Sequence, residues 1–240
     1  MRYSTGIEQL DKALGGGLLP GTLTMVIGAT GVGKTQLAMA FRQAALQTDA
    51  FEEQACGAVI DLSSRGDSQN HNGYAERMFS QPLTVANPAV DEAPHPFSDA
   101  RPADVLPFLG YGGRRVLRSQ MDVDQWHAWQ SELNRRLPFL SRYVYSHLVA
   151  GTRRFIVDGI EPQSNDDDSL QLDLLEFIYH RMLRKEHDWL AREVLREKFL
   201  ENASLVEKHP YDHRHASAMV LVTTGESMLE QLMTRPLCRR

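Results

Sequence analysis

An eight-residue segment near the amino terminus, Gly28 to Thr35, contains the residue types that bind nucleotide phosphates. It reads GATGVGKT and matches the pattern G-x-x-x-x-G-K-[ST] at every defined position. Its glycines let backbone N–H groups converge on phosphate oxygens, Lys34 supplies a positive charge for the β- and γ-phosphates, and Thr35 supplies a hydroxyl for Mg²⁺. We therefore expect ATP to bind at this P-loop (Walker A), which consists of Gly28, Ala29, Thr30, Gly31, Val32, Gly33, Lys34 and Thr35.

A second group of candidate residues lies at the end of the apolar run RRFIVDG, residues 153–159. An aspartate at the end of a buried strand is typical of the Walker B element, which holds Mg²⁺ through a water molecule. We therefore expect Asp158 to lie opposite Thr35 across the metal. Glu161, three residues further on, is a candidate general base, with an ordinary loop residue as the alternative interpretation.

Apolar and β-branched runs predict the elements that position these residues. The run TLTMVI at 22–27 leads directly into the P-loop, and apolar positions at helical spacing predict a helix from about Gly33. This order places the positive end of the helix dipole under the phosphates. Further strands are expected at 57–62 (GAVIDL), 153–159 and 218–224 (AMVLVTT), so the chain is predicted to have an α/β fold.

A longer pattern around the P-loop resembles the start of the RecA-superfamily ATPases, in the branch that contains KaiC and RadA. It begins with STGI at 4–7, continues with L-D-x-x-L-G-G-G at 10–17 and ends with GKT at 33–35. The close resemblance covers about the first 45 residues. It implies a RecA-like P-loop core with a mostly parallel central sheet flanked by helices, ATP and Mg²⁺ as cofactors, and a homo-oligomer of the hexameric-ring type.

One departure from the resembled family concerns the general base. In that family the strand equivalent to 57–62 ends in acidic residues, one of which activates the attacking water, whereas Ser63 and Ser64 stand there in this chain. A serine cannot act as a carboxylate base near neutral pH. Asp61 and Glu161 are candidate substitutes, although a hydrogen bond near the strand would equally explain Asp61.

Two segments are predicted to be insertions in a single domain of residues 1–240. Prolines crowd 67–122, which predicts an extended insertion or lid over the core. Residues 165–215 begin with an acidic run and continue with helical periodicity, which predicts a helical insertion that could bind a protein partner. Between them we expect two helices, 123–136 and 139–150, separated by Pro138.

Composition narrows the classes of partner. The formal net charge of −5 and a pI near 6.0 indicate no global attraction to nucleic acid, and leave local binding open. The two cysteines support neither a disulfide framework nor a zinc site. No apolar run of about eighteen residues and no signal-peptide core is present, which predicts a cytoplasmic protein without a membrane segment.

The carboxyl-terminal part offers weaker candidates. Thr223 and Thr224 end the last predicted strand, and we expect them near the site. Arg235, Arg239 and Arg240 could act on the nucleotide of a neighbouring subunit, but a polar tail is the simpler interpretation.

Two functions follow from these features. The first is ATP binding with slow Mg²⁺-dependent hydrolysis, coupled to regulation or DNA metabolism. The alternative is a non-hydrolysing nucleotide-dependent switch or scaffold that has lost the catalytic glutamate.

Overall fold

A computed structural model of the chain describes residues 2–29, 31–47, 56–63, 70–86, 101–108, 121–160 and 216–224. Its helices are α1 (Glu8–Ala13), α2 (Lys34–Gln43), α3 (His71–Phe79) and α4 (Val123–Val149), with a short 3₁₀ helix, η1 (Ala44–Gln47), directly after α2. Its strands are β1 (Leu23–Ala29), β2 (Ala58–Asp61), β3 (Val105–Pro107), β4 (Arg154–Ile160) and β5 (Ala216–Thr223). The predicted segment 165–215 and the three carboxyl-terminal arginines lie outside the described residues.

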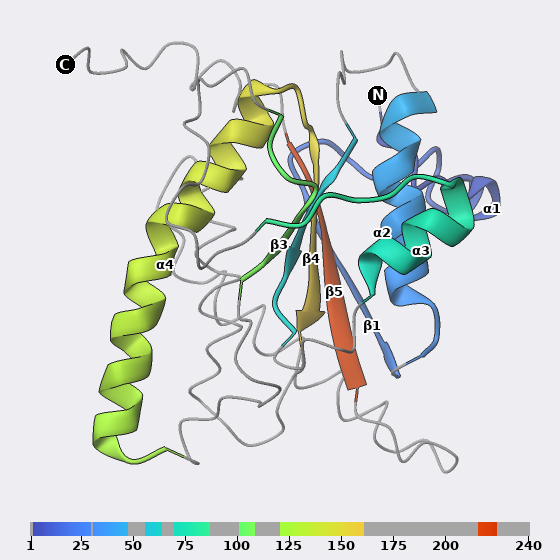
Figure 1. Ribbon diagram of the computed structural model, residues 1–240. Helices are drawn as coiled ribbons and strands as arrows, with labels where there is room; N and C mark the ends of the chain where they lie inside the picture. The colour runs from blue at the N-terminus through green and yellow to red at the C-terminus, as the bar shows by residue number, and fades with distance from the viewer. Residues whose placement is uncertain are drawn as a thin grey trace.

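The strands form one sheet in the order β1-β5-β4-β2-β3 (Figure 1). β2 pairs in parallel with β3 and with β4, whereas β5 is antiparallel to both of its neighbours, β1 and β4. β1, β2, β3 and β4 therefore run in one direction and β5 in the other. This arrangement confirms the predicted α/β fold with a mostly parallel central sheet.

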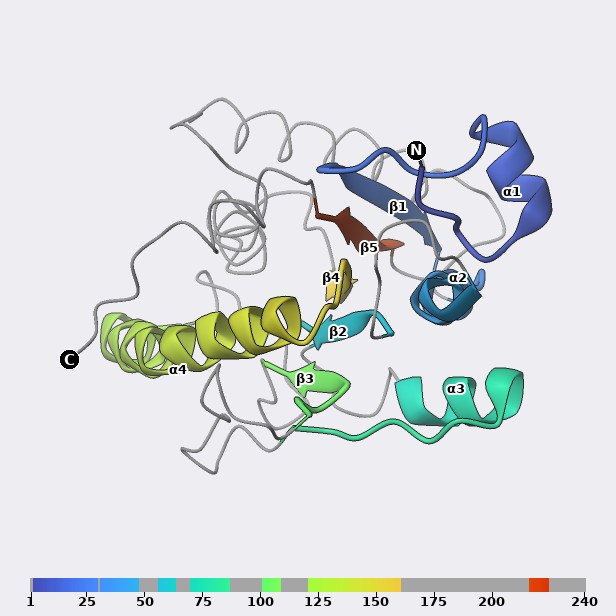
Figure 2. The same cartoon turned by 90° about the horizontal axis from the view of Figure 1, so that it is seen from above.

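Helices cover both faces of the sheet, α4 on one side and α2 and α3 on the other (Figure 2). Alternate residues of β2 and β4 point to the two faces, as expected for buried strands. Ile60 and Val157 pack with Leu140 and Tyr143 of α4. Val59 and Ile156 belong to a second cluster, with Ala38, Met39 and Phe41 of α2 and Ala75 of α3.

The helix α4 is continuous through Pro138, so the prediction of two helices was wrong. A proline inside a helix costs about 3 kcal/mol. Burial of a large apolar side chain contributes about 1.5–3 kcal/mol, and several such side chains of α4 are buried on both sides of the proline. A capping box between Asp122 and Gln125 also fixes the start of the helix. The packing of these side chains therefore outweighs the tendency of Pro138 to end the helix.

The described parts of 67–122 include one helix and one strand, and the rest of the predicted insertion lies outside the described residues. α3 packs against the P-loop side of the sheet, and β3 pairs with β2 at the sheet edge. Pro107 ends the edge strand β3, where a missing N–H is tolerated. These elements belong to the core of the fold.

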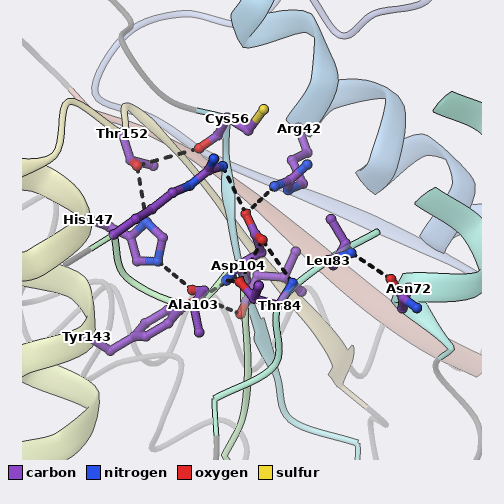
Figure 3. Close-up of polar contacts among 12 residues, drawn as sticks. Arg42, Cys56, Asn72, Leu83, Thr84, Ala103, Asp104, Tyr143, His147 and Thr152 are labelled. Atoms are coloured by element: carbon purple, nitrogen blue, oxygen red, sulfur yellow. Dashed lines mark hydrogen bonds and ion pairs between the residues drawn. The ribbon is translucent and has the colours of Figure 1, made fainter. Parts of the chain in front are cut away.

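A buried polar cluster lies at the amino ends of β2 and β3, where Asp104 precedes β3 (Figure 3). The Asp104 carboxylate forms an ion pair with Arg42 and accepts hydrogen bonds from the backbone N and Oγ1 of Thr84. Burial raises the pKa of Asp104, but these hydrogen bonds and the charge of Arg42 outweigh it, so the pKa lies below its usual value. The cluster joins α2 to β3 at the edge opposite the P-loop.

The position of Thr223 and Thr224 contradicts the expectation that they lie near the P-loop. Val222 pairs with Leu23 at the start of β1, and Thr223 Oγ1 donates to the Leu19 carbonyl at 2.6 Å. The direction of β5 is the reason, because an antiparallel strand brings its first residue, Ala216, beside Ala29.

Within the described ranges, the helices lack the combination of length and apolarity that a membrane span requires.

Candidate nucleotide-binding site

The P-loop connects the end of β1 to the start of α2, as the sequence predicts. β1 ends at Ala29, and Gly33 forms the amino-terminal cap of α2. Gly31 and Gly33 have φ values of 89° and 98°, a left-handed conformation that favours glycine. Val32 lies between them with 63% of its side chain exposed. Thr30 lies outside the described residues.

Lys34 is held inside the loop. Its Nζ donates to the carbonyls of Gly28 at 2.9 Å and Ala29 at 2.7 Å, and only 9% of the residue is exposed. Burial lowers the pKa of the Lys34 ammonium, and the negative charge of Asp158 opposes that effect. The charge therefore lies at the loop that binds phosphates in proteins with this pattern.

Asp158 contacts the first turn of α2. Thr35 Oγ1 donates to Asp158 Oδ2 at 2.9 Å, and the backbone N of Gly159 donates to Asp158 Oδ1 at 2.8 Å. The side chain of Asp158 is almost fully buried. The structure thus brings Thr35 and Asp158 together, although they are far apart in the sequence.

The main chain at the end of β4 allows this contact. The pairing of β4 with β5 shifts its register between Val157 and Ile160, and Gly159 there has φ 79°. A Cβ on Gly159 would lie 2.5 Å from the backbone N of Ser63. Only glycine fits at this position, which fixes the direction of the neighbouring Asp158 side chain.

Asp61 ends β2 and pairs in register with Asp158. Its Oδ1 accepts a hydrogen bond from the backbone N of Ser63 at 2.8 Å. Burial raises the pKa of Asp61, the charge of Asp158 raises it further, and His71 and the Ser63 hydrogen bonds oppose the rise. Two carboxylates therefore lie on adjacent strands at this edge. Ser63 is buried beside them, while Ser64 and Glu161 lie outside the described residues.

Sequence reasoning missed one residue of the site, His71. It is the first residue of α3, it is 3% exposed, and its Nε2 lies 3.1 Å from Asp158 Oδ2. No motif marks it, and the segment around it was assigned to a proline-rich insertion. Only the packing of α3 beside α2 reveals its position.

The polar groups beside the P-loop fit Mg²⁺ in one mode of binding. The described residues contain no group of three or more His, Cys, Asp or Glu side chains that could hold a metal alone. Mg²⁺ prefers oxygen ligands and usually binds through one or two protein groups together with waters and substrate phosphates. The Thr35 hydroxyl and the Asp158 carboxylate beside a P-loop fit that mode of binding.

The segment before β1 packs on the site-bearing helix. Asp11 accepts hydrogen bonds from the backbone N and Oγ1 of Thr5, both at 2.7 Å. A Cβ on Gly6, which has φ 80°, would lie 2.4 Å from the Ala40 carbonyl of α2. The buried Arg154 side chain, between the rings of Tyr3 and Phe41, donates to backbone carbonyls of Ser4 and Phe41. These contacts give the STGI and L-D parts of the pattern a structural role.

Comparison with known proteins agrees with the site. Residues 3–60 match the family model described as "ATPase: KaiC". The DNA repair protein RadA of Mycobacterium tuberculosis, in strains CDC 1551 / Oshkosh and ATCC 25618 / H37Rv, is 54% identical over 33 residues. That stretch is 14% of this chain and only 7% of each RadA. No solved structure matches the chain.

The strand, P-loop and helix and the amino-terminal segment packed on α2 all lie within residues 3–60, the part of the chain that matches the family model. These residues are therefore similar to the KaiC ATPase family, and a shorter stretch of the chain is similar to RadA.

Proposed function

We propose that this chain binds Mg-ATP at Gly28–Thr35 and Asp158 and hydrolyses it slowly. The observation that carries the proposal is the 2.9 Å contact between Thr35 Oγ1 and Asp158 Oδ2, beside the buried Lys34. It joins the start of α2 to the end of β4 with the two oxygen groups that Mg²⁺ needs in P-loop proteins.

Different residues of the site bind the phosphates and the metal in this proposal. Backbone N–H groups of the loop and the start of α2 bind the phosphate oxygens, and Lys34 compensates negative charge on the β- and γ-phosphates. Thr35 and Asp158 would hold Mg²⁺, which stabilises negative charge on the phosphates during transfer. Water attacks the γ-phosphorus, the bond to the β-phosphate oxygen breaks, and ADP and phosphate leave.

Asp61 is the described carboxylate proposed to accept the proton of the attacking water. Its raised pKa makes it a stronger base than an ordinary aspartate, although desolvation also favours its neutral form. Glu161 stays the alternative candidate from the sequence. Lysine and metal stabilise the transition state without a base, so slow turnover is expected even where the base is poorly placed.

One observation favours the second function, a nucleotide-dependent switch without hydrolysis. Ser63 follows β2 where the resembled family has an acidic residue, and it is buried. Asp61 is still part of β2 and accepts a hydrogen bond from the Ser63 backbone. Among the described residues, therefore, no carboxylate follows β2 at the position of the family's acidic residue. The switch differs from the enzyme only in turnover.

The decisive experiment measures ATP binding and hydrolysis on the same samples of the purified protein with Mg²⁺. Lys34→Ala should abolish or strongly weaken binding, and unchanged affinity would contradict the P-loop assignment. Asp158→Asn should reduce Mg²⁺-dependent turnover more than metal-free binding, and equal losses would contradict its metal role. Binding by the wild type without turnover would establish the switch.

The cellular role is proposed more broadly as regulation or DNA metabolism. The similarity to a DNA repair protein, RadA, supports DNA metabolism, while the net charge of −5 does not favour general nucleic-acid binding. A ring-type homo-oligomer, a protein partner for 165–215 and a cytoplasmic location stay predictions. Stimulation of turnover by single-stranded DNA would favour the DNA role.

A further inference from the structure

His71 is the part of the site that the P-loop pattern does not explain. It is brought in by α3, whereas Asp158 is on β4 and Thr35 on α2. The side chains of His71 and Asp158 are both nearly inaccessible to solvent, and their Nε2 and Oδ2 atoms are 3.1 Å apart. An ionisable pair this deeply buried requires favourable geometry.

The hydrogen bonds on Asp158 define its orientation. Oδ2 accepts from Thr35 Oγ1 at 2.9 Å, and Oδ1 accepts from the Gly159 backbone at 2.8 Å. His71 Nε2 lies within hydrogen-bond distance of the same Oδ2, and this contact is satisfied when Nε2 carries the hydrogen and the carboxylate oxygen accepts it. The three donors come from three elements, α2, α3 and β4, and together they hold both oxygens of one carboxylate.

His71 is itself held in place by the local structure of α3. The side chain of Asn70 caps the helix by accepting from the Gly73 backbone at 2.7 Å, and Asn72 Oδ1 accepts from the Leu83 backbone at 2.6 Å. Ala75, one turn later, is buried against α2 and the sheet. The imidazole therefore reaches the site from a fixed helix end.

We propose that His71 is a positioning residue for the Mg²⁺ site. By donating Nε2–H to Asp158 Oδ2, it holds the carboxylate against Thr35, so the gain in ATP affinity caused by Mg²⁺ depends on His71. Groups that orient a metal ligand commonly change metal affinity by about 10–100-fold when removed. This inference rests on the proposed function of the same site.

The experiment compares ATP affinity with Mg²⁺ and with a chelator, using a fluorescent ATP analogue at one fixed pH. His71→Leu removes the donor at similar volume, and His71→Gln keeps an amide donor. The exposed His127→Leu makes the same substitution at the surface of α4 and is the matched control. Thermal melting of each variant reports folding independently of the nucleotide.

The expected result is selective loss of the metal effect. His71→Leu should reduce the Mg²⁺-dependent gain about tenfold or more and leave metal-free affinity unchanged, while His71→Gln and the His127→Leu control keep most of the gain. A gain that survives in His71→Leu, or equal losses with and without Mg²⁺, would overturn the inference. If His71→Leu does not fold, His71→Gln decides alone, because loss of the gain with a donor present contradicts the argument and its retention supports it. No Mg²⁺-dependent binding by the wild type would overturn the proposed function itself.

Discussion

His147 should make the stability of this protein sensitive to moderate acid. It lies near the end of α4, where the Ala103 carbonyl accepts from its Nε2 at 2.9 Å and Thr152 Oγ1 lies 3.1 Å from its Nδ1 (Figure 3). Burial lowers the pKa of His147 from 6.5 to about 4. The folded protein therefore holds the imidazole neutral at a pH at which the unfolded chain already binds a proton.

The magnitude follows from this pKa difference. The contribution to the free energy of unfolding is complete above a pH of about 6.5 and is lost as the pH falls from there toward the folded-state pKa of about 4. The loss amounts to about 2 kcal/mol at pH 5 and about 3 kcal/mol at pH 4. Against a typical total stability of about 5–15 kcal/mol, this is large enough to measure.

The assay is urea unfolding followed by tryptophan fluorescence at pH values of about 7.5 and 5. His147→Gln keeps an amide donor for the Ala103 carbonyl and cannot titrate. The wild type should be more stable at the higher pH, and its advantage over the variant should shrink by about 2 kcal/mol at the lower pH.

The exposed His127→Gln serves as the control, because it makes the same substitution at the surface of α4. If the advantage of the wild type over His147→Gln is the same at both pH values, the burial argument for His147 is refuted. If the advantage of the wild type over His147→Gln is larger at the lower pH, the effect of His147 on stability has the opposite sign to the one expected.

Three further predictions concern backbone fit and the buried ion pair. Gly159→Ala places a Cβ 2.5 Å from the Ser63 backbone at φ 79°, so thermal melting and Mg²⁺-dependent ATP binding should both decline, with a stability loss of about 1–3 kcal/mol; unchanged melting and binding would contradict this. Gly6→Ala should lower the melting temperature more than Gly15→Ala, because both sites have positive φ but only Gly6 has Ala40 in the way; equal effects would count against the close approach. Asp104→Asn leaves Arg42 without its buried counter-charge and should cost about 3–5 kcal/mol in urea unfolding, whereas the exposed Asp124→Asn should cost little.

Local features of this chain could be predicted from the sequence because their signals are local. The strand before Gly28, the helix from Gly33 and the strand that ends near Asp158 depend on apolar runs and on glycines needed for positive φ. The approach of Asp158 to Thr35 was also expected, although only by combining two separate motifs.

Contacts between distant segments could not be predicted in the same way. His71 meets Asp158 across 87 positions of sequence, and no residue near it marks that contact. The continuity of α4 through Pro138 depends on packing against β2 and β4, which local propensity does not contain. The apolar run of β5 does not reveal the direction of the strand, because such a run can pair in parallel or antiparallel with its neighbours.

The direction of β5 has a consequence for how this chain can change in length. Neighbouring parallel strands need a connection that crosses the sheet, but antiparallel neighbours such as β4 and β5 can be joined at a single edge. The last residue of β4, Ile160, and the first residue of β5, Ala216, therefore lie at the same edge of the sheet, near Asp158 and Ala29. Doubling the length of such a connection costs only about 0.6 kcal/mol in closure entropy. Evolution can thus lengthen, shorten or replace the connection between β4 and β5 without altering the sheet, and each replacement starts and ends at the edge that carries the P-loop.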